Sequence, residues 1–429
     1  MNPLLYGHNP DTHLVALHQH GESEIRVYFR RDGATVSEDT DFFPFFFISD
    51  KSHLTGFPKK HWVKELLGSN HYRFLCVFTR WSDMWEGVNF ALQKYNQANE
   101  PKVQSYAEAE FLLVRPDPVT QYLMQTGRTL FKEMKFEDLY RLQLDIETYS
   151  RQRFSKAERS DDRIIVVGLS DSMGWEHTID GRRKSEREML RELVDVINEK
   201  DPDVIEGHNI FNFDLPYIMQ RCLLNGVDFA IGRDGSSPRS SSTSLDRETE
   251  FVTYELNGRH IIDTWLLVQS YDIGKRDMES YGLKYVARYF GFSSPDRVYI
   301  IGDKISWYWD NDSEILIRYA LDDVRETRML SQHLSATAFH LAQMGPLNYG
   351  TTARLGTAAK IEALLLREYL GQKHSVPKPT QGVQTTGGYT DLFYTGVLGP
   401  VVHVDVESLY PSIMINEGIC PKSDPLRIF

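Results

Sequence analysis

Three separate stretches of the chain combine carboxylates with apolar or aromatic neighbours in patterns that suit metal-ion chemistry. In the first stretch, Asp145 and Glu147 alternate with Leu144 and Ile146. If this stretch is a strand, the two carboxylates lie on one face and the apolar side chains lie on the other. Two carboxylates on one buried face repel each other unless a cation lies between them. The pattern therefore indicates a divalent metal site, and the alternative is a strand face that is open to solvent.

The second stretch runs from His208 to Pro216 and contains Asn209, Phe213 and Asp214. Asp214 directly precedes a helical pattern, so one interpretation is a helix N-cap with Pro216 in the first turn. The amide and the aromatic ring favour a second interpretation, because an exposed ring beside a carboxylate could stack on a nucleic-acid base. Both interpretations stay open from this stretch alone.

The third stretch places Tyr319 and Asp323 four residues apart, on one face of a predicted helix. Asp323 interrupts an inward-facing stripe that is formed by Leu316, Ala320, Thr327 and Leu330. A carboxylate in such a stripe is costly unless it is paired or binds a metal. The alternative is an acid at the edge of an amphipathic helix, and the adjacent Asp322 is predicted to be solvated.

The elements that must position these carboxylates alternate between strands and helices over residues 140–330, which predicts an α/β domain. The predicted strands are 142–148, 164–169, 204–205, 251–254 and 260–263. The predicted helices are 185–199, which opens with a capping-box pattern, 215–225 and 313–334. The intervening segment 232–246, rich in Ser, Gly and Arg, is predicted to be an exposed loop.

The flanking regions have different patterns. Residues 24–29 alternate polar and apolar side chains as a half-buried strand does, and the apolar run 42–47 is a second strand candidate. Pro44 within that run favours a sheet edge. Further predicted elements are helices within 84–98 and 335–370, a loop at 371–395 and a strand at 401–406.

The composition is that of a folded globular protein, with 41% hydrophobic and 25% charged residues among 429. The formal net charge of −12 argues against a protein that holds nucleic acid by overall charge alone. No apolar run is long enough to cross a membrane, the first residues do not resemble a secretion signal, and the three cysteines form no CxxC pair. We expect an intracellular, non-secreted protein without membrane partners, in the cytoplasm (nucleoid) if the source is prokaryotic.

Together, the three carboxylate stretches resemble the exonuclease motifs of family B DNA polymerases. Those motifs are Asp-x-Glu, here at 145–147, Asn-x3-Phe-Asp, here at 209–214, and Tyr-x3-Asp, here at 319–323. Residues 404–414, which include Asp405 and Tyr410, resemble polymerase motif A. Residues 385–389 occupy the place of the Tyr-x-Gly-Gly linker motif, with Thr385 where the family has Tyr.

The resemblance implies a ribonuclease H-like, mixed-sheet α/β exonuclease domain at residues 131–335. It also implies a β-rich (α+β) N-terminal domain at 1–130, a helical linker region at 336–395, and the start of a truncated polymerase palm, with its first strand, at 396–429. The fingers helix with its Lys and the Asp-Thr-Asp hairpin of the family do not occur in this sequence. We therefore expect the N-terminal portion of a polymerase or one piece of a split polymerase, with DNA-directed DNA synthesis only in a complete chain.

The implied activity is a 3′–5′ proofreading exonuclease that releases 5′-mononucleotides from single-stranded DNA 3′ ends. The residues implied to hold two Mg²⁺ or Mn²⁺ ions are Asp145, Glu147, Asp214 and Asp323. Tyr319 is implied to orient the attacking water, and Asn209, Phe213 and Thr148 to contact DNA. DNA is the expected partner, together with the remainder of the polymerase or a sliding clamp. The alternatives are an RNA-trimming 3′–5′ exonuclease and a nucleic-acid-binding scaffold piece.

Overall fold

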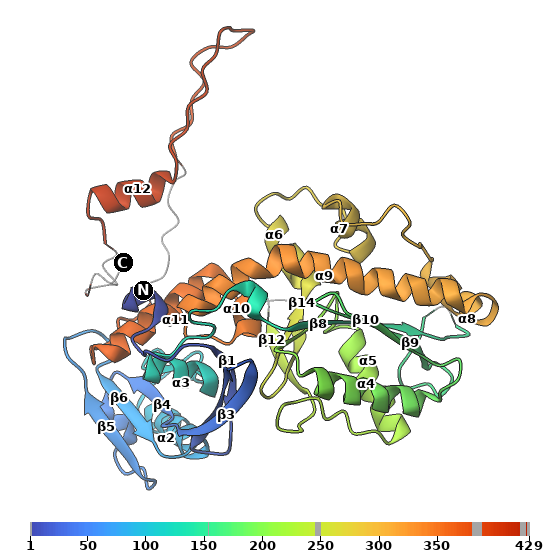
Figure 1. Cartoon of the computed structure of the whole chain (residues 1–429). Helices are drawn as coiled ribbons and strands as arrows, with labels where there is room; N and C mark the ends of the chain where they lie inside the picture. The colour runs from blue at the N-terminus through green and yellow to red at the C-terminus, as the bar shows by residue number, and fades with distance from the viewer. Residues whose placement is uncertain (1, 153, 245–249, 380–387, 421–425, 427–429) are drawn as a thin grey trace. The chain divides into compact units, whose positions relative to one another are not determined.

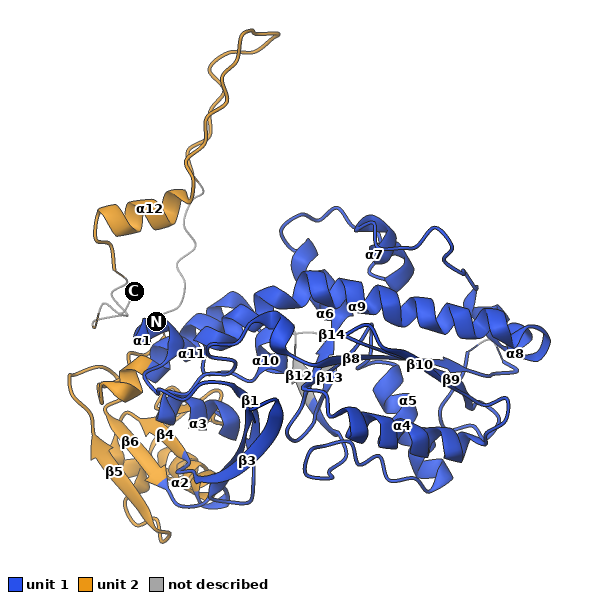
Figure 2. Ribbon diagram, in the orientation of Figure 1, with its two compact units in different colours: residues 1–44, 78–83, 115–367 blue, residues 45–77, 84–114, 368–429 orange. Residues whose placement is uncertain are grey.

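A computed structural model describes residues 2–152, 154–244, 250–379, 388–420 and 426 of the chain (Figure 1). The chain forms two compact units, which are described separately (Figure 2). The first unit comprises residues 1–44, 78–83 and 115–367, and the second comprises 45–77, 84–114 and 368–429. The domain boundaries expected from the sequence stay predictions.

The first unit is built around a mixed five-stranded sheet with the strand order β10-β9-β8-β11-β14. Its strands are β8 (Arg141–Thr148), β9 (Ile164–Asp171), β10 (Glu176–Asp180), β11 (Val204–Gly207) and β14 (His260–Asp263). Strands β8, β11 and β14 are parallel, whereas β9 and β10 pair antiparallel. The predicted α/β class with a mixed sheet is confirmed.

Helices pack on both faces of this sheet (Figure 1). On one face, Leu144 and Ile146 of β8 are buried in a core with residues of α4 (Glu186–Lys200) and α5 (Asp214–Asn225). On the other face, β9 packs against α8 (Ile305–Asn311) and α9 (Ser313–Met344). Because side chains alternate along a strand, Asp145 and Glu147 of β8 lie on the face that α9 covers.

The helix boundaries follow local sequence signals. Helix α4 begins with the predicted capping box between Ser185 and Glu188. Helix α9 runs ten residues beyond the predicted end at residue 334, since no Gly or Pro interrupts it before Gly345. The other helices of the first unit are α1 (Pro3–Tyr6), α3 (Pro118–Thr126), α6 (Thr264–Asp272), α7 (Leu283–Tyr289) and α10 (Tyr349–Arg354). Helix α11 (Thr357–Gly371) follows, where the sequence predicts helix.

The approach of α9 to the sheet depends on a glycine. Gly168 of β9 pairs with Asp145 of β8, and a Cβ at Gly168 would lie 2.8 Å from the carbonyl oxygen of Ala320 in α9. It would also lie 3.3 Å from Cγ1 of Val324. The backbone of α9 can therefore reach the sheet beside Asp145 only because this position carries no side chain.

We expect Gly168→Ala to lower the free energy of unfolding by about 1–3 kcal/mol, because the new methyl group must displace α9. Chemical denaturation measures this change. A matched control is Gly356→Ala, where a Cβ would meet no atom within 4 Å. Equal stability of the two variants would contradict the role assigned to Gly168.

The remaining strands lie in smaller sheets. In the first unit, β1 (Leu14–Gln19), β2 (Glu24–Arg31) and β3 (Ala34–Asp41) form an antiparallel sheet. The second unit holds a sheet with the order β5-β6-β4-β7, which consists of β5 (His61–Glu65), β6 (Phe74–Phe78), β4 (Phe45–Ile48) and β7 (Leu112–Val114). The prediction that Pro44 marks a sheet edge is wrong: β4 lies inside the sheet, and Pro44 precedes the strand, so its missing N–H interrupts no ladder. Helix α2 spans Trp81–Ala98, where the sequence predicts helix.

Two further sequence predictions need correction. Within the predicted loop 232–246, Arg239–Ser244 forms strand β12, which pairs with β13 (Glu250–Glu255). Its serine-rich sequence lacks the apolar alternation that signals a strand, although backbone pairing does not require it. Residues 401–406 are extended but pair with no other strand among the described residues, so the predicted strand does not form. Helix α12 (Leu409–Asn416) follows them. Residues 385–387 of the linker motif lie outside the described residues.

No helix within the described residues combines the length and the apolar character that a membrane span requires.

Candidate active site

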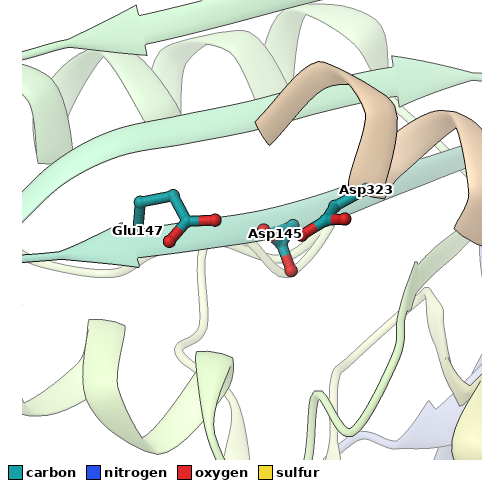
Figure 3. Close-up of side chains that lie close together, drawn as sticks. All are labelled: Asp145, Glu147 and Asp323. Atoms are coloured by element: carbon teal, nitrogen blue, oxygen red, sulfur yellow. The ribbon is translucent and has the colours of Figure 1, made fainter. Parts of the chain in front are cut away.

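Three of the predicted carboxylates converge between β8 and α9 (Figure 3). Asp145 and Glu147 of β8 and Asp323 of α9 each offer an oxygen atom, and these atoms all lie within 4.8 Å of one another. Glu147 is 8% exposed and Asp323 is 2% exposed. Side chains from distant parts of the chain thus form one acidic cluster, in which Glu147 and Asp323 are buried and Asp145 is partly exposed.

Asp214 adjoins this cluster from a different direction. It is the first residue of α5, it is 2% exposed, and its Oδ1 accepts a hydrogen bond from the backbone N–H of Ile146 at 3.1 Å. Ile146 lies between Asp145 and Glu147 on β8, so the carboxylate of Asp214 is held against the strand that carries the other two. The helix begins at Asp214 itself, and the preceding residue, Phe213, makes no side-chain capping bond.

The cluster is electrostatically strained without a bound cation. Burial raises the pKa of Glu147 to about 8, with the charge of Asp323 adding to the effect. Burial also raises the pKa of Asp214 to about 7, although the N–H of Ile146 opposes the shift. The pKa of Asp145 lies well above its usual range because of burial and then the charges of Asp323, Asp214 and Glu147. Shifted carboxyl groups of this kind are typical of metal and catalytic sites.

Two basic side chains contact the cluster, and no motif in the sequence predicts them. Lys284 of α7 places its Nζ 2.5 Å from Oδ2 of Asp323 and 4.5 Å from the centre of the Tyr319 ring. Arg297 pairs with Asp323 and also with Glu326, whose Oε1 lies 3.1 Å from Nε. These residues reach Asp323 only through the tertiary placement of α7 and the segment after it, so no local signal could have found them.

Tyr319 lies beside the cluster and is 7% exposed. Burial raises the pKa of its phenol, and the charges of Asp323 and Glu147 raise it further. The hydroxyl therefore stays protonated near neutral pH and can act as a hydrogen-bond donor, not as a base.

A pocket of about 480 Å³ lies next to the carboxylates, and its wall includes Glu147, Thr148, Phe213 and Tyr319. Phe213 is 36% exposed, and the hydroxyl of Thr148 donates to Oγ of Ser155 at 2.9 Å. Asn209 does not line this pocket, but its backbone oxygen accepts the N–H of Phe213 at 3.1 Å. The structure thus brings two of the three predicted DNA-contacting residues to one surface and connects the third to it through the backbone.

The motif A residues do not belong to this cluster. Asp405 and Tyr410 lie in the second unit, where Tyr410 is 75% exposed and the Asp405 carboxylate accepts the N–H of Val406 at 2.9 Å.

Known proteins resemble this chain in sequence and in fold. Residues 178–286 match the family model for the exonuclease domain of DNA polymerase family B. The chain is 28% identical over 320 residues to DNA polymerase 1 of Pyrococcus abyssi, which covers 70% of this chain and 39% of the relative. It is 27% identical over 305 residues to DNA polymerase 2 of Aeropyrum pernix, which covers 70% of this chain and 36% of the relative.

A solved structure shares the fold. It is the family B DNA polymerase from the hyperthermophilic archaeon Pyrobaculum calidifontis, which superposes with a TM-score of 0.66 at 22% identity over 86% of this chain and 51% of the other. Residues 178–286 are thus similar to the exonuclease domain of family B DNA polymerases, and the chain is similar in sequence to archaeal DNA polymerases over 70% of its length. Its fold is similar to that of a family B DNA polymerase. The chain spans well under half of the length of the relatives named here.

Proposed function

We propose that the acidic cluster is the active centre of a 3′–5′ exonuclease that removes 5′-mononucleotides from the 3′ ends of single-stranded DNA. The observation that carries this proposal is the convergence of Asp145, Glu147 and Asp323 within 4.8 Å beside an open pocket. The family match at residues 178–286 supports the same activity.

The donor set fits divalent ions. Carboxylate oxygens are the ligands that Mg²⁺ and Mn²⁺ prefer, and the raised pKa values of Glu147 and Asp214 mark an excess of negative charge. The residues that would hold two such ions are Asp145, Glu147, Asp214 and Asp323. When bound, a pair of divalent ions activates water and stabilises the attacking and leaving oxygens of a phosphodiester. Lys284 and Arg297 balance part of the carboxylate charge. The negative charge that remains is less than two divalent ions carry, so the phosphate of the substrate would supply the rest.

The protein's own residues would position the substrate. The protonated hydroxyl of Tyr319 would donate a hydrogen bond to the attacking water and orient it. The half-exposed ring of Phe213 would stack on a terminal base, because base–aromatic stacking does not depend on sequence. Thr148 and Asn209 would contact the terminal nucleotides, and the duplex must be unpaired for its 3′ end to reach the pocket.

The test is digestion of a 5′-labelled single-stranded DNA oligonucleotide by the full chain with Mg²⁺ or Mn²⁺. We expect 5′-mononucleotides released stepwise from the 3′ end and slower digestion of RNA of the same sequence. Faster digestion of the RNA would favour an RNA-trimming exonuclease. Binding of the oligonucleotide without digestion would favour a scaffold, and calorimetry with Mg²⁺ would then show whether the cluster binds metal.

DNA-directed DNA synthesis is proposed only for a complete polymerase. Asp405 and Tyr410 would contribute to its active site as parts of motif A. Nucleotidyl transfer by two metals also needs a second carboxylate opposite Asp405, which the rest of the polymerase would supply. A sliding clamp stays a predicted partner.

A further inference from the structure

Asp263, the last residue of β14, makes two hydrogen bonds beyond the one that caps the following helix. Asp263 is 3% exposed, and its carboxylate accepts three backbone N–H groups. Oδ1 accepts from Trp265 at 2.9 Å and from Asn209 at 2.8 Å, and Oδ2 accepts from Phe211 at 3.3 Å. No ion pair involves Asp263 in the part of the chain that the structure describes.

Only one of these bonds belongs to an ordinary helix cap. Asp263 is the N-cap of α6, and the bond from Trp265 satisfies that role. The other two bonds cross to the loop that follows β11. Because β11 and β14 are parallel neighbours with Gly207 opposite Asp263, this loop leaves the sheet directly beside the carboxylate.

The loop is fixed by several contacts, of which the bonds to Asp263 are one set: Ile210 and Phe211 are buried in the core, and the His208 ring contacts the hydroxyl of Thr264 and the carbonyl oxygen of Tyr281. Asn209 has a left-handed backbone conformation with φ of 68°. Its carbonyl oxygen accepts the N–H groups of Asn212 and Phe213, both at 3.1 Å, which closes a tight turn. The N–H of Asn209 points out of this turn to Asp263, so the carboxylate fixes where the turn places Phe213.

The metal-site carboxylate at the end of the same loop is held separately. Asp214 is fixed by the N–H of Ile146 on β8 and by the start of α5. The hydrogen bonds of Asp263 thus reach Asn209 and Phe211 and not Asp214, although the charge of Asp263 contributes to the raised pKa of Asp214.

We infer that Asp263 is a positioning residue for substrate binding, which holds the Asn209–Phe213 turn so that the Phe213 ring can receive the terminal base. The inference rests on the proposed exonuclease function for its substrate. It assigns to Asp263 a role in binding DNA and none in holding metal.

The test is Asp263→Asn in the full chain. The amide keeps one acceptor oxygen but turns an N–H donor toward the backbone N–H groups, so the turn loses part of its anchor. We expect KM for single-stranded DNA to rise about tenfold or more and kcat at saturating Mn²⁺ to fall by less than about threefold. An unchanged KM, or a loss of kcat with no change in KM, would overturn the inference.

Asp171→Asn is the matched control. Asp171 is 2% exposed, ends β9 and accepts the backbone N–H groups of Met173 and Trp175, both at 2.9 Å, in a turn that lies outside the pocket wall. Unlike Asp263, it also accepts the hydroxyl of Tyr140 at 2.7 Å and pairs with Lys200 at 3.6 Å, so its substitution should cost at least as much stability. Both variants should lose stability, but only Asp263→Asn should raise KM. If Asp263→Asn does not unfold cooperatively, Asp263→Ser, which keeps a hydroxyl acceptor, should show the same rise in KM.

A failure of the proposed exonuclease function can be recognised separately. If the unmodified chain digests no DNA, the affinity for a fluorescent single-stranded oligonucleotide is measured by anisotropy in the presence of EDTA. Weaker binding by Asp263→Asn than by Asp171→Asn would then support the positioning role, and equal binding would refute it.

Discussion

The double substitution Asp145→Ala with Glu147→Ala should lower exonuclease turnover by at least about 10³-fold, because it removes two of the three carboxylates whose oxygens lie within 4.8 Å of one another. The same substitution should raise the thermal stability of the metal-free protein. Both carboxyl groups lie among like charges, Glu147 buried and Asp145 partly exposed, and their raised pKa values indicate that ionisation is disfavoured in the folded state. Digestion of labelled DNA and thermal unfolding in EDTA measure the two effects.

Asp322→Asn controls for the loss of a carboxylate near the site. Asp322, which the sequence predicts to be solvated, is instead largely covered: its carboxylate accepts the N–H of Val298 at 3.0 Å and pairs with Arg325 at 3.1 Å, and it lies 3.9 Å from Nη1 of Arg297. This variant should keep its nuclease activity. Substantial digestion by the double variant would show that the acidic cluster is not the active centre.

The convergence of the carboxylates was largely predictable, because strand periodicity is a strong signal. The alternation at 142–148 placed Asp145 and Glu147 on one face, and the structure has β8 at Arg141–Thr148. The stripe on the predicted helix at 313–334 likewise pointed Asp323 inward, where the structure buries it. Both signals arise from the periods of regular elements and need no knowledge of tertiary packing.

The residues that the sequence did not predict depend on packing between distant elements. Lys284 lies on a seven-residue helix without a motif, and Arg297 lies in an irregular segment, so their contacts with Asp323 arise only when α7 packs near α9. Asp263 did leave a signal. It ends a predicted strand at 260–263, and the carboxyl ends of neighbouring parallel strands meet at one edge of a sheet, where ligand sites gather.

The metal-free protein should lose roughly 2 kcal/mol of stability as the pH rises from about 6.5 to about 8. Burial raises the pKa of Glu147 to about 8 and the pKa values of Asp214 and Asp263 to about 7 in the folded state, all above the values near 4 of unfolded carboxyl groups. The folded state therefore retains these protons longer, and the stability that protonation provides is lost as the pH rises through the folded pKa. Thermal or urea unfolding in EDTA across this range measures the loss.

Buried histidines act in the opposite direction but at lower pH. Burial lowers the pKa of His18 and of His208 to about 4, so their contribution to stability increases between about pH 4 and 6.5 and is constant above that. The fall above pH 6.5 thus reports the carboxylates and not the histidines.

A divalent ion should reverse the fall, because it binds the ionised carboxylates and competes with protons for the same oxygens. Stabilisation by Mn²⁺ or Mg²⁺ should therefore grow with pH over the range in which the metal-free protein weakens. The Asp145→Ala, Glu147→Ala variant should lose most of the stabilisation by metal and the part of the pH dependence that comes from Glu147, whereas Asp214 should keep its part, because burial and the charges of Asp263 and Asp323 raise its pKa. If the variant kept the same pH dependence and the same stabilisation by metal, Glu147 would not be one of the titrating groups, and the metal site would have to lie elsewhere in the protein.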